Sequence, residues 1–193
     1  MANNTLPQLA QEKICLVCDT DEEGQALLRH LQRHRAAVTR FWPPQERIGE
    51  NADIVLCEYF PRMGGRLAWV PGEPCAALII LLPQTGRYDL AEIRAACPDA
   101  VLHRPYVAHA IDVSLTVALD HFGYNKRQRL RIARLEENGR AMRDIEKAKQ
   151  VIMSSKNVGE QEAYRILRDI AMKRRLPVAT VAGKFVDAAE NLF

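Results

Sequence analysis

The stretch Lys13-Ile-Cys-Leu-Val-Cys-Asp-Thr-Asp21 decides the fold of the first half of this chain. Residues 14–18 are all apolar, and the run ends at two acidic residues, Asp19 and Asp21. A short continuous apolar run is typical of a strand that is buried on both faces of a parallel sheet. The next segment, residues 23–33, carries leucines at helical spacing. The stretch therefore predicts a strand, an acidic turn and a helix.

Four further β-prone segments follow before Phe122, each closed by a proline or a charged residue. They are residues 37–42, 53–57, 76–82 and 100–102. Continuous apolar strands that alternate with helical segments form parallel sheets covered on both faces. We therefore expect an α/β doubly wound domain with a five-stranded parallel sheet over residues 1–121.

Functional side chains in such sheets collect at the carboxyl ends of the strands. Reading those ends along this chain gives Asp19, Asp21, Glu58, Leu82 and Arg104. The layout resembles the receiver domain of bacterial response regulators over about residues 13–121. The resemblance implies a receiver-like (CheY- and flavodoxin-like) fold. In receivers these positions hold an acidic pair for magnesium, a phospho-accepting aspartate, a hydroxyl residue and a lysine.

Three of those positions lack the chemistry of phosphorylation. Glu58 in place of aspartate moves the attacking oxygen by about one C–C bond, ~1.5 Å, which positional catalysis tolerates poorly. Leu82 has no hydroxyl, and the planar guanidinium of Arg104 does not substitute for an ammonium group. We therefore expect a pseudo-receiver with a degenerate phospho-acceptor site that takes an input other than phosphorylation. Arg104 is expected to pair with Glu58, either as a static ion pair or with a switching role.

The cysteines and histidines do not suggest a metal or redox site. The five cysteines are predicted to be reduced core thiols, with Cys15 and Cys18 on opposite faces of one strand. Because no second Cys pair or His cluster stands at zinc-ligand spacing, neither a metal nor a cofactor is expected. The absence of a Ser/His/Asp set and of a Gly-rich phosphate loop argues against an enzyme.

The composition is that of a soluble globular protein with an uneven distribution of charge. No stretch approaches the ~18 apolar residues of a membrane span, and residues 1–12 lack the features of a signal peptide, so a cytoplasmic location is expected. Residues 1–121 carry 11 basic and 15 acidic residues, whereas residues 122–193 carry 16 and 9. This asymmetry favours a basic module for a polyanion joined to a more acidic module. A solvated helical surface is the alternative.

A long polar run begins near Tyr124, and residues 122–153 are predicted to form one long helix. Apolar residues recur along it at steps of three and seven, namely Ile132, Leu135, Met142 and Ile145. Because a single helix cannot bury such a stripe alone, we expect a coiled-coil homodimer through these residues. Packing against the chain's own helices is the alternative, since Gly139 interrupts the stripe.

Two shorter helices are predicted beyond a break at residues 154–159. The segments that follow one another here resemble the ANTAR domain, the RNA-binding module of transcription antiterminators, over residues 127–188. The resemblance rests on Ala148-Lys149, Glu162-Ala163-Tyr164, Leu167-Arg168 and Ala171-Met172. It implies a C-terminal three-helix bundle. The chain as a whole resembles the AmiR-like antiterminators of the ANTAR family.

The second of the three helices offers a candidate RNA surface. Tyr164, Arg168, Met172 and Arg175 lie at i, i+4, i+8 and i+11, and therefore share one stripe. An exposed tyrosine beside an arginine is a stacking platform for a loop base. Packing between helices is the alternative for the tyrosine and the methionine. Phosphate contacts are expected from Lys149, Lys173 and Arg174.

The family resemblance implies a transcription antitermination regulator. Such a protein would bind two adjacent hexaloop hairpins in an mRNA leader and prevent the terminator from folding, which agrees with the general preference of proteins for splayed loop bases. The resemblance also implies an AmiC-like small-molecule-sensing repressor protein as partner. A DNA-binding response regulator and an RNA-binding regulator of translation are the alternatives.

Overall fold

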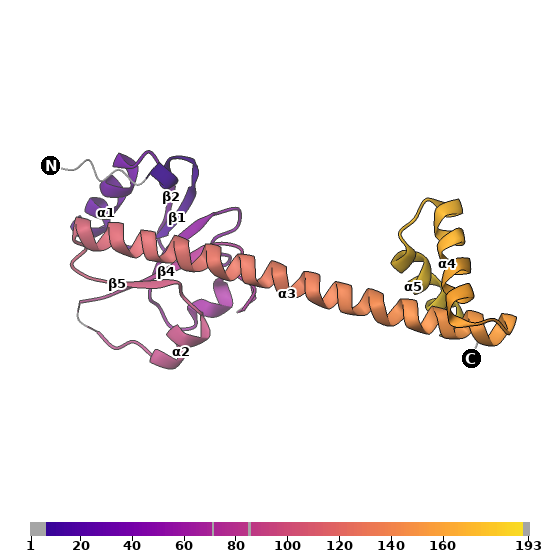
Figure 1. Cartoon of the computed structure of the whole chain (residues 1–193). Helices are drawn as coiled ribbons and strands as arrows, with labels where there is room; N and C mark the ends of the chain where they lie inside the picture. Colours follow the sequence, from indigo (N-terminus) through magenta and orange to yellow (C-terminus); the bar gives the residue numbers. More distant parts are fainter. Residues whose placement is uncertain (1–6, 71, 85, 191–193) are drawn as a thin grey trace. The chain divides into compact units, whose positions relative to one another are not determined.

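The computed structural model describes residues 7–70, 72–84 and 86–190 (Figure 1). The chain divides into two compact units, with the boundary between Lys126 and Arg127. Within the described residues, none of the helices combines the length and the hydropathy that a bilayer span requires.

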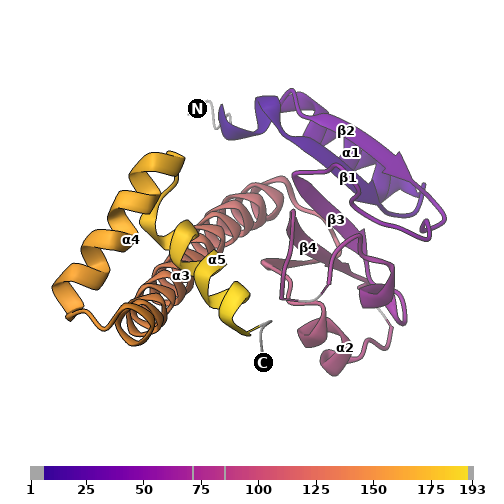
Figure 2. The ribbon, with the colours of Figure 1, turned by 90° about the vertical axis from the view of Figure 1, so that its right-hand side faces the viewer.

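The N-terminal unit is built on a five-stranded parallel sheet (Figure 2). The strands lie in the order β2-β1-β3-β4-β5, which confirms the predicted doubly wound sheet. Because this order places β1 beside β3, the crevice where such sheets hold their functional groups lies at the ends of these two strands. The strands are β1 (Lys13–Val17), β2 (Ala37–Phe41), β3 (Ile54–Glu58), β4 (Ala77–Leu82) and β5 (Ala100–His103).

Side chains of the strands alternate between two cores, one on each face of the sheet. On one face, Leu16 and its neighbours pack against α1 (Glu22–Arg33) and the first turns of α3 (Ala108–Lys156). On the other face, Val17 and its neighbours pack against α2 (Leu90–Ala95) and the loops around it. The continuous apolar runs of the sequence are explained by this burial on both faces.

Three of the five cysteines are buried as predicted, and two are not. Cys15 and Cys18 belong to the cores on opposite faces of the sheet, as their spacing indicates. Burial raises the pKa of the Cys18 thiol to about 11, so this thiol stays protonated at neutral pH. The core prediction was wrong for Cys75 and Cys97, which are exposed because they lie in connections between elements rather than in strands.

Two crossover connections contain no α-helix, although the sequence predicted alternation of strands and helices. Residues 42–53, between β2 and β3, form turns and extended segments. The described residues between β3 and β4 contain a single short 3₁₀-helix, η2 (Met63–Arg66). Proline lacks the N–H that a helix needs, and Pro43-Pro44 opens the first of these connections. Residues of these two connections cover the face of the sheet that also carries α2. Among them are Ile48, Met63, Leu67 and Trp69.

The long helix α3 begins at Ala108, well before residue 122, where the sequence predicted its start. Its first turns bury Ile111, Leu115 and Ala118 in the core of the N-terminal unit. None of residues 124–147 is buried. The change in composition near residue 122 therefore marks where the helix stops burying side chains, not where it begins.

The C-terminal unit is a small three-helix bundle. The end of α3 packs with α4 (Glu160–Arg174) and α5 (Val178–Glu190) around a core of small and branched apolar residues. Alanines allow the three helix backbones to approach closely, so short helices bury a continuous core. The buried members are Ala148, Ile152, Ala163, Leu167, Ala171, Val181, Ala182 and Val186.

Candidate nucleic-acid interface and strand-end cluster

Arg104 lies at the centre of a charged cluster at the carboxyl ends of the strands. Its Nη2 donates to Oε1 of Glu58 at 3.0 Å, and its Nη1 donates to Asp21 and, at 3.4 Å, to Glu23. The side chains of Arg104 and Glu58 are only 13% and 14% exposed. The expected pair of Arg104 with Glu58 is present, and the one guanidinium bonds to three carboxylates and so reduces the repulsion among them.

Both carboxylate oxygens of Glu58 are engaged within the cluster. Oε1 accepts from Arg104, while Oε2 accepts from the backbone N–H of Asp19 at 3.1 Å. Leu82, at the end of β4, is 3% exposed and belongs to the core on the α2 side of the sheet. The predicted site residues thus lie together at the strand ends, but their geometry is that of an ion cluster and offers no hydroxyl to a phosphoryl group.

Asp21 connects this cluster to the start of α1. Its Oδ1 accepts from the N–H of Gly24 at 2.8 Å, which makes Asp21 the N-cap of the helix. The hydrogen bond from Arg104 lowers the pKa of Asp21 below its usual value, and the Gly24 N–H lowers it further. The carboxylate therefore remains ionised as a counter-charge to Arg104.

Sequence reasoning missed two members of the cluster, Glu23 and Arg40. Arg40 lies next to the end of β2, from where its Nη2 donates to the carbonyl of Asp19 and its Nε donates to that of Cys18 at 3.4 Å. The edge strand β2 is thereby joined to the acidic turn after β1. The position of Arg40 near the end of β2 could have identified it from the sequence, because functional side chains collect at strand ends in such sheets.

Three of the seven predicted RNA contacts, Tyr164, Arg168 and Met172, form an exposed stripe on α4, and Arg175 follows just after the helix. Tyr164 and Met172 are 44% and 66% exposed, and Arg168 and Arg175 are exposed as well. A different side of α4, which carries Ala163, Leu167 and Ala171, packs into the core of the C-terminal unit. Packing between helices, the alternative for the tyrosine and the methionine, is therefore not what this unit shows.

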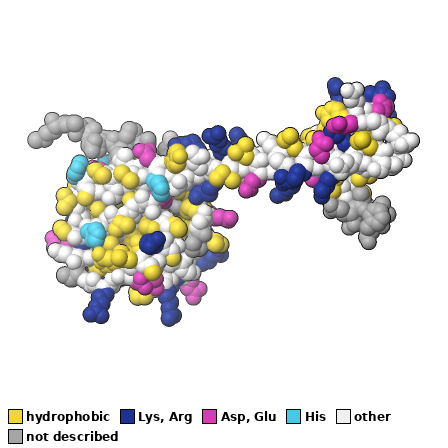
Figure 3. Space-filling view, turned by 60° about the horizontal axis from the view of Figure 1, so that its bottom comes forward, with side chains coloured by type: hydrophobic (Ala, Val, Ile, Leu, Met, Phe, Trp, Pro, Cys, Tyr) yellow, Lys and Arg dark blue, Asp and Glu magenta, His cyan; other side chains and the backbone are white. Residues whose placement is uncertain are grey.

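The last turn of α4 is strongly basic. Lys173 and Arg174 are exposed there, and Arg175 follows as the C-cap. Cations at this end of a helix are stabilised by the helix dipole. Further Lys and Arg side chains gather along the visible face of α3 (Figure 3).

Lys149 differs from the other predicted RNA contacts because it is 8% exposed. Its Nζ donates to Glu146 at 2.7 Å and to Glu160 at 2.6 Å. These hydrogen bonds raise the pKa of Lys149, and the bond from Lys149 lowers the pKa of Glu160. Since Glu160 begins α4, the ion pair joins α3 to α4. This geometry favours a structural role for Lys149 over the predicted phosphate contact.

The apolar stripe predicted for dimerisation is largely uncovered within a single chain. Ile132, Leu135 and Met142 are 53%, 61% and 70% exposed. Ile145 is partly buried and packs against the core of the C-terminal unit. Three of the four residues are therefore available to a partner helix, while the fourth contributes to the chain's own bundle.

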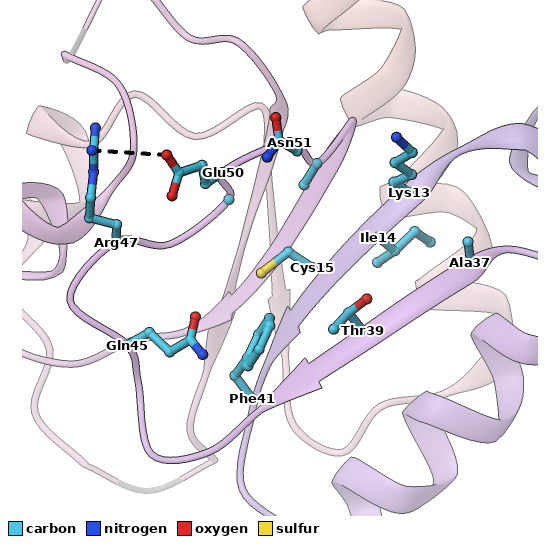
Figure 4. A pocket seen from close by; sticks show the side chains of 12 residues that line it. Lys13, Ile14, Cys15, Ala37, Thr39, Phe41, Gln45, Arg47, Glu50 and Asn51 are labelled. Carbon is cyan, nitrogen blue, oxygen red and sulfur yellow. Dashed lines mark ion pairs between the residues drawn. The ribbon is translucent and has the colours of Figure 1, made fainter.

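A hollow of about 530 Å³ lies over β1 and β2, beside the loop that connects β2 to β3 (Figure 4). Cys15, Thr39 and Phe41 line it from the strands. Arg47 and Glu50, which form an ion pair at 3.9 Å, line it from the loop. None of the predicted site residues lines this hollow, so it is separate from the strand-end cluster.

Comparison with known proteins accounts for both parts of the chain. Residues 12–119 match the family model for the N-terminal region of AmiR, and residues 133–186 match the ANTAR domain. The aliphatic amidase regulator of Pseudomonas aeruginosa is 26% identical over 184 residues, which cover 94% of each chain. Among solved structures, the response regulator StyR has a similar fold, with a TM-score of 0.50 and 14% identity over 92% of this chain and 99% of that chain.

Proposed function

Since this chain belongs to the AmiR family of ANTAR-containing transcription antitermination regulators, we propose that it acts by binding two adjacent hexaloop hairpins in an mRNA leader. Holding both hairpins keeps the overlapping terminator from folding, so that RNA polymerase reads through. The observation that carries the proposal is the exposed stripe of Tyr164, Arg168 and Met172 on α4, with Arg175 exposed at the C-cap.

The stripe has the chemistry that loop recognition requires. Bases in a hairpin loop are splayed out of the stem, where an aromatic ring or a guanidinium plane stacks on them. The ring of Tyr164 and the guanidinium of Arg168 lie one helical turn apart on the exposed stripe. Stacking of this kind contributes about 1–3 kcal/mol per base. Lys173 and Arg174 add positive charge for the phosphates beside the loop.

Dimerisation through α3 supplies the second RNA-binding unit. The exposed residues Leu135 and Met142 flank Gly139 on one side of the helix, where a Cβ on the glycine would meet only the end of the Arg143 side chain, at 3.6 Å. A partner helix can therefore approach closely at this point. In a dimer the second loop binds at high effective concentration, so a two-hairpin leader is favoured over a single hairpin without any new contact.

Control by a partner protein is the other part of the proposal. In the strand-end cluster Arg104 donates a hydrogen bond to Glu58, and Leu82 supplies no hydroxyl. Phosphorylation is therefore not the input. An AmiC-like repressor that senses a small molecule would instead hold the regulator until an inducer binds, with the pseudo-receiver and α3 as the interface.

The experiment is binding of the purified full-length protein to a labelled two-hexaloop RNA at stated salt concentrations. A one-loop RNA and a duplex DNA serve as controls. Two-loop-dependent binding without a phosphodonor is the expected result. Preference for duplex DNA would overturn the proposal in favour of a DNA-binding regulator. Equal affinity for one-loop and two-loop RNA would overturn the dimeric antitermination mechanism.

A further inference from the structure

Two histidines and an aspartate meet between α1 and α3 in the N-terminal unit. His30 lies in the last turn of α1, His34 is its C-cap, and Asp112 lies in the first turns of α3, 82 positions after His30. The sequence analysis did not anticipate this cluster. Its third member comes from a distant segment, which local spacing could not show.

The ligand atoms of these side chains converge on one point. Nε2 of His30 lies 2.7 Å from Oδ1 of Asp112, and Nε2 of His34 lies 3.2 Å from the same oxygen. The two Nε2 atoms lie 3.4 Å from each other. The three side chains are 11%, 9% and 13% exposed, so the point is nearly closed to solvent.

These separations can be compared with those of a metal centre. Zinc binds imidazole nitrogen and carboxylate oxygen at about 2.0–2.2 Å in tetrahedral geometry, so its ligand atoms lie about 3.3–3.5 Å apart. The distance between the two histidines and that between His34 and Asp112 are close to this value. The distance between His30 and Asp112 needs to lengthen by about 0.6 Å, a movement that rotation of one carboxylate supplies.

The geometry points to a binding site for a divalent transition-metal ion, with zinc as the natural occupant, formed by His30, His34 and Asp112. Two histidines four residues apart share one face of a helix end, which is the arrangement that chelates a metal. Imidazole and carboxylate ligands suit Zn²⁺, Co²⁺ and Ni²⁺ rather than the all-oxygen cations. The fourth position is left to a water molecule or an exogenous ligand.

Occupation of the site would join α1 to the first turns of α3. Each imidazole binds a metal through the Nε2 lone pair and carries its proton on Nδ1. Without the metal, Nε2 of His30 is hydrogen-bonded to Asp112 and lies within hydrogen-bond distance of Nε2 of His34. Because α3 leads on from this point to the C-terminal unit, the metal would stabilise the N-terminal end of the helix that connects the two units.

The test is a metal titration of the chelator-treated full-length protein. Calorimetry with Zn²⁺ is expected to give one site per chain, and Zn²⁺ is expected to raise the melting temperature. Titration with Co²⁺ is expected to give the intense d–d absorption of a tetrahedral ion without thiolate charge-transfer bands, which excludes ligation by the exposed Cys75 and Cys97. Absence of a saturable site in this protein would overturn the proposal and leave a hydrogen-bonded cluster only.

Variants assign the ligands. Asp112→Asn and His34→Gln keep hydrogen-bonding groups in place and are each expected to weaken zinc binding at least tenfold. His103→Gln removes an exposed histidine at the end of β5 and is expected to leave the affinity unchanged. Circular dichroism establishes that each variant is folded before it is titrated. Retention of full zinc affinity by folded Asp112→Asn and His34→Gln would overturn the assignment.

Discussion

The guanidinium of Arg104 donates to the carboxylate of Glu58 at 3.0 Å across the ends of β5 and β3, and both side chains are nearly buried. In a receiver these two positions hold the groups that accept and report a phosphoryl group. Here they neutralise each other. The pair therefore joins the end of β5 to the end of β3.

Removal of Arg104 should cost more stability than removal of an exposed arginine. Arg104→Ala leaves Glu58 without its counter-charge, so the free energy of unfolding should fall by about 3 kcal/mol. Arg47→Ala is the matched control, because the pair of Arg47 with Glu50 is long and exposed and should contribute less than about 1 kcal/mol. Urea unfolding of both variants measures the difference. Equal losses of unfolding free energy in the two variants would show that solvent screens the charges of the cluster.

The same cluster predicts a loss of stability in acid. The folded pKa of Asp21 lies below its unfolded value of 3.8. The stability that its ionised form contributes is therefore fully present above pH 3.8 and is lost as the pH falls through the lower folded pKa. Asp21→Asn keeps the N-cap but removes the charge. The difference in unfolding free energy between the two proteins should shrink below pH 3.8, and a difference that is constant with pH would contradict this assignment.

The stripe on α4 predicts which arginine contributes to RNA binding. Arg168→Ala and Tyr164→Ala should each weaken binding to the two-hexaloop RNA by about 10-fold or more, the range that loss of one stacking contact gives. Arg165→Ala is the matched control on the same helix, because its guanidinium already pairs with Glu162 at 2.7 and 2.9 Å. Fluorescence anisotropy with labelled RNA measures all three. An equal loss for Arg165→Ala would indicate charge alone rather than a defined surface.

The dimer interface can be tested with two identical substitutions on one helix. Leu135→Glu places a charge in the proposed coiled-coil seam and should shift the protein to monomers in sedimentation velocity. Leu130→Glu introduces the same charge at a leucine that is also exposed but lies about 140° around the helix. It should leave the dimer intact. If neither substitution changes the sedimentation coefficient, α3 is not the dimer interface.

Lys149 should behave as a structural residue. Lys149→Met removes its bonds to Glu146 and Glu160, and therefore the ion pair between α3 and α4. A lower melting temperature is expected, together with a smaller loss of RNA affinity than Arg168→Ala causes. Glu160→Gln should lower the melting temperature in the same direction. If Lys149→Met instead loses much of its RNA affinity at an unchanged melting temperature, Lys149 contacts the RNA.

Local patterns in the sequence determined the five strands, the helix that follows the first strand and the shared stripe on α4. Each of these depends on residues that are neighbours along the chain. A continuous apolar run predicts a strand buried on both faces, and positions four apart share one side of a helix. The same reasoning placed Asp19, Glu58 and Arg104 at one edge of the sheet, because parallel strands end together.

Only the tertiary structure decided what these residues contact. Lys149 was expected at phosphates, but packing of α4 against α3 brings Glu160 to its ammonium group. His30 and His34 gain Asp112 because the first turns of α3 cover α1, a helical region that the composition of residues 108–121 did not reveal. The physical reason is the same in both cases. Burial and ion pairing depend on distances between segments that are remote in the sequence, and no local pattern contains those distances.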